Sequence, residues 1–216
     1  MDAGHVKRIS MFVIGLFVMT LGIAISTKAD IGTTPISSIP FVVSLASGVD
    51  LYVTTLVLNI ILIAIQIIVL GKGFKLFNLL QIPTALIFSF FTKITVDLVE
   101  GWYPSSYLEC WIYSVVSVLV LGIGVALVVN SRTTMVPGEG AVLALSIRTK
   151  VPFSRMKIIF DVTNITIAAL ISLAVFGGLE GVREGTVFAA VSIGVVVRYA
   201  TKVIKKVFPD PENNIS

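Results

Sequence analysis

The sequence contains one cysteine, Cys110, one histidine, His5, and few charged residues, which make up 13% of the chain. A single cysteine cannot form an internal disulfide, and it cannot hold a metal ion alone. With one histidine there is little material for a nucleophile–base pair, and no Walker loop, HExxH or GxSxG motif occurs. We therefore expect no enzyme activity, no cofactor and no metal site.

Apolar residues, in contrast, are abundant. They make up 56% of the 216 residues, and the mean hydropathy is +1.01. A soluble domain has roughly 25% charged residues, so this much apolar surface cannot be buried in one small core and most of it must face lipid. The net charge of +4 does not indicate nucleic-acid binding, because the basic residues lie at the ends of apolar runs. The sequence predicts an all-α polytopic membrane protein.

The apolar runs are long enough for six membrane-spanning helices. We predict these spans at about 9–27, 51–70, 76–99, 110–129, 155–176 and 184–201. Two short helices, at about 35–47 and 138–148, each follow a break that contains proline and glycine. The first run follows Lys7 and Arg8 as in a signal peptide, but it is long enough to span and we expect it to be retained. Residues 1–8 and 204–216 are predicted cytoplasmic termini, the latter ending in a disordered polar tail.

One stretch occurs twice, at a constant offset of 102 residues. GIAISTKADIGTTPISSIPFVVS, residues 22–44, aligns without a gap with GVALVVNSRTTMVPGEGAVLALS, residues 124–146. The alignment predicts two repeats, 9–103 and 104–203, each with three spans, a Pro/Gly break and a short helix. Because three is an odd number, the two repeats must run through the membrane in opposite directions, as inverted repeats do.

The charges favour six spans over a rival arrangement of eight. With six spans and a cytoplasmic N-terminus, most of the 16 basic residues lie on the cytoplasmic side, as the positive-inside rule requires. Making 31–48 a full span would move Lys72 and Lys75 outside, and the matching stretch 132–150 is too polar to cross unaided. We therefore predict that both termini are cytoplasmic.

The second break contains the sharpest motif, Pro137, Gly138, Glu139 and Gly140. The glycines allow close backbone approach, and the carboxylate stands at the start of an apolar helix. It is predicted to form a cation, amine or proton site, or a gating ion pair with Arg132. The alternative is that Glu139 only caps the helix at a cytoplasmic loop.

The first break is rich in hydroxyl groups. Side-chain hydroxyls and free N–H groups at a helix start suit an anionic or hydrogen-bonding ligand, whereas the plainer interpretation is N-capping by Thr34 before proline. The residues concerned are Thr33, Thr34, Pro35, Ser37 and Ser38.

Polar residues inside the spans complete the candidate site. Asn59, Asp161 and Asn164 are predicted to face a cavity, because an intramembrane carboxylate is costly without a polar environment. Asp161 has an alternative as a structural partner of a nearby basic residue, for which Arg155, Lys157 and Arg198 are available. Lys93 and Asp97 are predicted to pair near the outer interface, and Gln66 and Gln81 to hydrogen bond between helices.

Two segments, VPGEGAVLALSIRTKVPFSRMKIIFDV and GGLEGVREGTVFAAVSIGVVV, resemble the bacterial YczE/YitT-type multispanning membrane proteins. Those proteins have a Gly-Pro-x-[DE]-Gly element after a span and a Gly-x-Gly-Thr opening of a later span. Here Arg183-Glu184-Gly185-Thr186 departs from the second element. The resemblance implies an integral protein of the bacterial plasma membrane with a poorly defined, transport-related function, and it supplies no substrate.

We therefore expect a small-solute transporter, either a carrier or a facilitator. The two breaks would meet near the bilayer midplane to bind an unidentified solute, with Glu139 or Asp161 responding to a proton or cation. One alternative is a substrate-binding subunit like the S-components of energy-coupling-factor importers, and another is an accessory membrane protein that does not transport. The sequence leaves the oligomeric state open.

Overall fold

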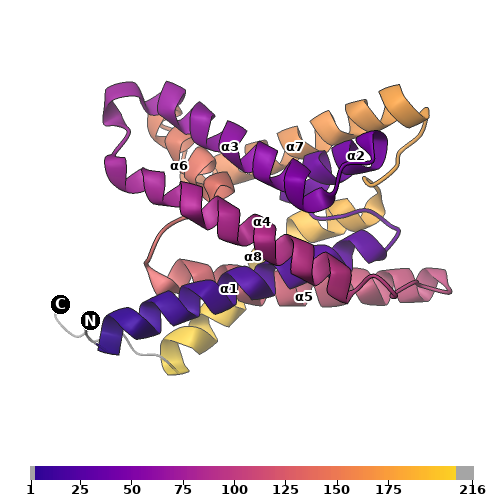
Figure 1. Cartoon of the computed structure of the whole chain (residues 1–216), viewed down its shortest axis with the longest axis horizontal. Helices are drawn as coiled ribbons and strands as arrows, with labels where there is room; N and C mark the ends of the chain where they lie inside the picture. The colour runs from indigo at the N-terminus through magenta and orange to yellow at the C-terminus, as the bar shows by residue number, and fades with distance from the viewer. Residues whose placement is uncertain (1–2, 208–216) are drawn as a thin grey trace.

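The computed structural model describes residues 3–207, which are helical and contain no strand (Figure 1). Two short helices, α2 and α6, follow the two breaks, and α2 is preceded by a 3-10 turn, η1. The long helices are α1 Ala3–Lys28, α3 Leu51–Leu70, α4 Gln81–Leu98, α5 Tyr107–Ser131, α7 Phe153–Phe176 and α8 Glu184–Val207. The short elements are η1 Pro35–Ser37, α2 Ser38–Ser47, η2 Gly71–Gly73, η3 Leu76–Leu80 and α6 Pro137–Thr149. The predicted polar tail, 209–216, lies outside the described residues.

Six of these helices are long and apolar enough to cross a bilayer, with window hydropathies between 1.5 and 2.7. The predicted all-α, multi-pass membrane fold is therefore confirmed. The short helix α6 has 13 residues, or about 20 Å at 1.5 Å per residue, which is less than the roughly 30 Å of the hydrocarbon core. Neither short helix can span, so the structure favours six spans over eight.

Turn residues end and start the short helices where the sequence indicates. Gly48, with a φ of 71°, caps α2 in the left-handed conformation, which glycine adopts without steric cost. Pro35 and Pro137 occupy the first positions of η1 and α6, where a missing N–H does no harm. Thr34 stands at the N-cap position, but its side chain does not cap the backbone.

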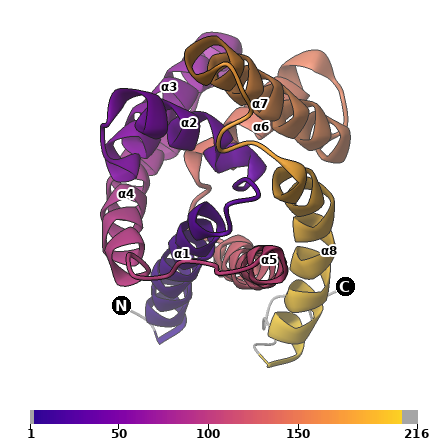
Figure 2. The same ribbon diagram turned by 90° about the vertical axis from the view of Figure 1, so that its right-hand side faces the viewer.

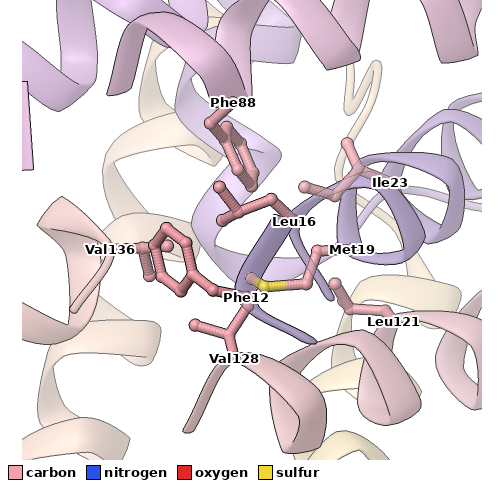
Figure 3. Packing of buried hydrophobic residues seen from close by; sticks show 8 residues of the cluster. All are labelled: Phe12, Leu16, Met19, Ile23, Phe88, Leu121, Val128 and Val136. Atoms are coloured by element: carbon pink, nitrogen blue, oxygen red, sulfur yellow. The ribbon is translucent and has the colours of Figure 1, made fainter. Parts of the chain in front are cut away.

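Helices α1 and α5 pack antiparallel at the centre of the fold. A Cβ on Gly22 would lie 2.5 Å from the backbone nitrogen of Leu121, and a Cβ on Gly124 would lie 2.5 Å from that of Met19. Glycine at both positions therefore lets the two backbones approach closely. A cluster of apolar side chains fills the space beside this contact (Figure 3), namely Phe12, Leu16, Met19, Ile23, Phe88, Leu121, Val128 and Val136.

The other helices surround this pair. Figure 2 shows α4 and α8 on opposite flanks of α1 and α5, with α2, α3, α6 and α7 gathered on the third side. The short helices each pack on a long helix of the other half of the chain, α2 on α7 and α6 on α3. On α4, Lys93 Nζ lies 5.6 Å from the centroid of the Tyr52 ring of α3, so this cation stacks on an aromatic ring instead of pairing with Asp97 as predicted.

Candidate functional site

The first break is held against the connection between α7 and α8. Three hydrogen bonds join them, from Thr33 N to Gly181 O (3.2 Å), from Gly185 N to Ile31 O (2.7 Å) and from Arg183 Nη1 to Asp30 O (2.9 Å). Gly32 has a φ of 98°, and a Cβ there would overlap Thr186 Oγ1. Residues 30–33 are therefore docked on residues 181–186.

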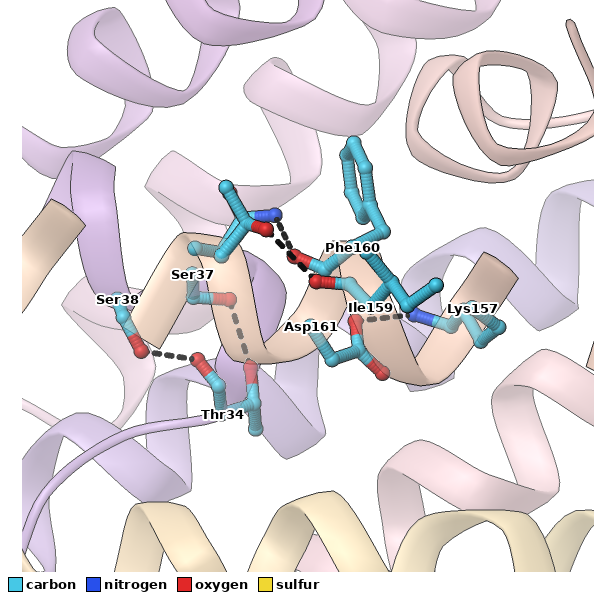
Figure 4. Close-up of polar contacts among 9 residues, drawn as sticks. Thr34, Ser37, Ser38, Lys157, Ile159, Phe160 and Asp161 are labelled. Carbon is cyan, nitrogen blue, oxygen red and sulfur yellow. Dashed lines mark hydrogen bonds and ion pairs between the residues drawn. The ribbon is translucent and has the colours of Figure 1, made fainter. Parts of the chain in front are cut away.

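The hydroxyl groups beside this contact bond to one another or to backbone. Thr33 Oγ1 lies 2.7 Å from Ser26 Oγ, Thr34 Oγ1 lies 2.8 Å from Ser37 Oγ, and Ser38 Oγ donates to Thr34 O at 2.9 Å. All of these side chains are buried. Figure 4 shows Thr34, Ser37 and Ser38 alongside α7. In this conformation the hydroxyls satisfy each other and do not line an open site.

The second break borders a cavity of about 820 Å³. One wall is the break itself, Arg132 to Met135, together with Glu139 and Gly140 of α6. The opposite wall is the connection between α3 and α4, which contributes Lys75 and Asn78. Arg132 and Glu139 thus line the same space, and a gating pair between them stays a prediction.

A pair of glutamines forms the inner end of this cavity. Gln66 of α3 and Gln81 of α4 exchange side-chain hydrogen bonds of 2.9 Å in each direction, as predicted for interhelical partners. Gln66 Nε2 also donates to Pro137 O at 3.2 Å. A Cβ on Gly140 would lie 2.6 Å from Gln66 Oε1 and 2.7 Å from Gln81 Oε1, so the glycine makes room for the pair. The sequence did not predict that Gly140 lies against both amides. The signal for a close neighbour at this position was that glycine has no side chain.

The two breaks touch, but not through the hydroxyl groups. A Cβ on Gly138 would lie 3.0 Å from Ile36 Cδ1, which places the start of α6 against η1. The polar pocket that the sequence suggests between the breaks is therefore filled here by an apolar side chain. Of the predicted site residues, Pro137, Gly138 and Gly140 lie at this contact or beside it.

The polar residues within the spans have different surroundings. Asp161 Oδ1 accepts from Lys157 Nζ at 2.6 Å (Figure 4), which is the structural pair considered as its alternative. Asn164 Nδ2 donates to Phe160 O at 2.8 Å on its own helix. Asn59 Nδ2 is buried without a hydrogen-bond partner, and the same holds for Ser89 Oγ. Orphaned buried polar atoms are rare and call for an explanation.

Asn59 and Ser89 stand at the same level of the α3–α4 pair. Gln66 of α3 faces Gln81 of α4 across these antiparallel helices. Asn59 lies seven residues before Gln66, and Ser89 lies eight residues after Gln81. Because the helices are antiparallel, both steps lead the same way along the helix pair and end at nearly the same height. The two orphaned groups therefore occupy the middle of the helix pair, about 10 Å from the glutamines at 1.5 Å per residue. Of the three predicted residues inside the spans, Asn59 alone keeps a buried donor unpaired.

Glu139 belongs to α6, which is not one of the six spans. Burial raises the pKa of its carboxyl group, and the positive charge of Lys157 opposes this shift in part. A raised pKa means that the neutral, protonated form persists to a higher pH than in an exposed glutamate.

We expect dicyclohexylcarbodiimide, which reacts with protonated carboxyl groups, to label Glu139 faster than an exposed glutamate at the same pH, because burial raises the pKa of Glu139. Exposed Glu180 serves as the internal control and should be labelled more slowly. Labelling of Glu139 should fall as the pH rises, because the ionised form does not react. Peptide mass spectrometry of the intact and the Glu139→Gln proteins measures this directly. Equal labelling of Glu139 and Glu180 at every pH would contradict it.

Residues 6–202 match the protein family described as a family of unknown function, DUF6198, and the chain belongs to this family. No curated protein and no solved structure matches the chain. The description of the family names no function and does not name the YczE/YitT type, so that resemblance stays a prediction.

Proposed function

We propose that this DUF6198 member is a small-solute membrane transporter in which the two breaks act as gates that open in turn to opposite faces of the membrane. One observation carries the proposal. The first break is bonded to the α7–α8 connection at three points, whereas the second break faces the α3–α4 connection across a cavity of about 820 Å³. The two breaks are thus in different states within one structure.

The 102-residue offset relates the two gates to each other. It carries residues 30–33 onto 132–135, and residues 181–186 onto 79–84. We name residues 30–33 and 181–186 the first gate, which is closed, and residues 132–135 and 79–84 the second gate, which is open. In transporters with inverted repeats, the opposite-facing state arises when each half takes up the other half's conformation. The second break would then dock on the start of α4 while the first break leaves the α7–α8 connection.

Packing supports the inverted relation between the halves. The antiparallel contact of α1 with α5 places Gly22 and Gly124, which the offset relates, against the partner backbone in the same way. The offset also relates pairs of helix contacts. It turns the packing of α2 on α7 into that of α6 on α3, and the packing of α4 on α1 into that of α8 on α5. All four contacts are present. A twofold axis between the halves accounts for these matches.

Charge supports the orientation. Basic residues cluster on the face where the cavity opens, and four of them line it, namely Lys75, Arg132, Arg148 and Lys150. The loops on the opposite face contain Asp30, Asp50, Glu100, Glu180 and Glu184. The positive-inside rule then puts the cavity on the cytoplasmic side, with both termini. In this assignment the structure is open to the cytoplasm and closed to the outside.

A solute bound between the gates would meet the level of Asn59 and Ser89. Their unpaired amide and hydroxyl groups can hydrogen bond to a polar solute that reaches the middle of the α3–α4 pair. The proposal includes no catalytic step.

The test is thiol accessibility of single cysteines on a Cys110→Ser background, in vesicles of both orientations, with a membrane-impermeant methanethiosulfonate. Met135→Cys, which lines the cavity and is 42% exposed, should label rapidly from the cytoplasmic face. Thr33→Cys, buried in the first gate, should label slowly and only from the outside, when that gate opens. Labelling of both sites from one face, or no outside labelling of Thr33→Cys at all, would overturn the proposal.

A further inference from the structure

The cavity beside the second break has an unusual charge balance for a space between apolar helices. Four basic side chains line it, Lys75, Arg132, Arg148 and Lys150, and the only carboxylate among its lining residues is Glu139. The basic groups come from three parts of the chain, which are the α3–α4 connection, the second break and the end of α6. The excess of cations creates a positive potential that a low-dielectric wall strengthens.

The rest of the lining is mostly apolar. Leu70 of α3 and Leu143 of α6 are examples from its two sides. A volume of about 820 Å³ falls in the range of roughly 300–1,000 Å³ that holds small organic ligands. Apolar walls with a cationic rim match a molecule that has an apolar body and an anionic group at one end.

We propose that this cavity binds an amphipathic anion, a carboxylate or phosphate group attached to an apolar body of small-molecule size. The anionic group contacts the cationic rim, and the apolar body lies against α3 and α6. This names the substrate class of the proposed transporter and therefore rests on that function. Glu139 lies in the same wall, so binding an anion there is easier when its carboxyl group is protonated, and the charge of Lys157, which pairs with Asp161 on α7, also acts on this carboxyl group.

The probes are three ligands with the same apolar body, 2-naphthoate, neutral 2-naphthol and cationic 2-naphthylmethylammonium. Calorimetry of the full chain in phosphatidylcholine nanodiscs measures each affinity. We expect 2-naphthoate to bind at least about tenfold more tightly than the ammonium ligand, because charge-assisted contacts favour the anion. Equal affinities, or a preference for the cation, would overturn the proposal.

The variant pair Lys75→Gln and Lys72→Gln tests the place of binding. Both lysines are exposed and lie in the same connection, but Lys75 lines the cavity and Lys72 does not. Lys75→Gln should weaken 2-naphthoate binding about fivefold, the upper range expected for losing one solvent-exposed charge pair. Lys72→Gln should leave it unchanged. An equal loss in both variants would assign the effect to surface charge and overturn the site.

The anionic group can belong to a soluble molecule or to a lipid headgroup, and a second disc composition distinguishes these sources. If phosphatidylglycerol in the disc abolishes the 2-naphthoate binding that phosphatidylcholine discs support, the occupant is an anionic lipid. If 2-naphthoate still binds, the occupant is a soluble anion. None of these measurements contains a transport step, so anion binding can fail while thiol accessibility still shows two alternating gates, and the converse also holds.

Discussion

Replacing Gly185 with valine should open the first gate. A Cβ at this position would lie 2.7 Å from the backbone oxygen of Ile31, and that oxygen also accepts the 2.7 Å hydrogen bond from Gly185 N. A backbone atom cannot rotate away, so the break must leave the α7–α8 connection. Loss of the hydrogen bond costs about 1 kcal/mol and overpacking about 1–3 kcal/mol. Since 1.4 kcal/mol corresponds to about tenfold, outside labelling of Thr33→Cys should rise at least about tenfold.

The control is Gly178→Val in the same connection. A Cβ on Gly178 would meet nothing within 4 Å, so this variant adds the same side chain without touching the break. In this variant, Thr33→Cys should be labelled from the outside at the same rate as in the parent protein. If Thr33→Cys is labelled equally slowly in the Gly185→Val and Gly178→Val proteins, the docked break does not close the outer path.

Replacing Gly140 with alanine should cause the largest loss of stability among single methyl additions near the second gate. The added Cβ would lie within 2.6–2.8 Å of the Gln66 and Gln81 amides. These side chains can move, but only by breaking their reciprocal 2.9 Å hydrogen bonds, and both are buried. Each buried amide left unsatisfied costs about 1–3 kcal/mol. We expect the melting temperature in detergent to fall by about 5–15 °C.

Gly194→Ala provides the matched comparison. Gly194 is also a helical glycine, but a Cβ there would meet nothing within 4 Å. Alanine should keep or slightly raise the melting temperature, because alanine favours helix by about 1 kcal/mol over glycine. A Gly140→Ala protein as stable as Gly194→Ala would show that the glutamine pair does not hold α6 in place.

The elements of this fold follow from local signals that a sequence contains. Long apolar runs predict the six spans because length and hydropathy decide insertion. Pro35 and Pro137 predict where the short helices begin, because proline suits the first helical position. Gly138 and Gly140 indicated close approach, and the structure places Ile36 and the two glutamines at these positions.

The partners of polar side chains could not be predicted in the same way. Asp161 had three basic candidates, and the choice of Lys157 depends on side-chain geometry within one helix turn. The hydroxyls of Thr34 and Ser37 are suited to binding a ligand, yet they bond to each other at 2.8 Å because the 3-10 turn η1 places residues three apart in sequence side by side. Two related repeats predict gates of the same architecture. Which gate is open is a property of one conformation, and the sequence of each repeat does not determine it.

The coupling of the gates is the central claim, and a spin-label distance across the second gate tests it most directly. Nitroxides on Thr133 and Asn78, which both line the open cavity, would be measured by double electron–electron resonance on the Cys110→Ser background. Opening the first gate with Gly185→Val should shift the protein population toward a shorter distance between the two nitroxides. Gly178→Val should give the same distance distribution as the parent protein. If Gly185→Val speeds outside labelling of Thr33→Cys but leaves this distance unchanged, the gates move independently and the alternating mechanism is contradicted.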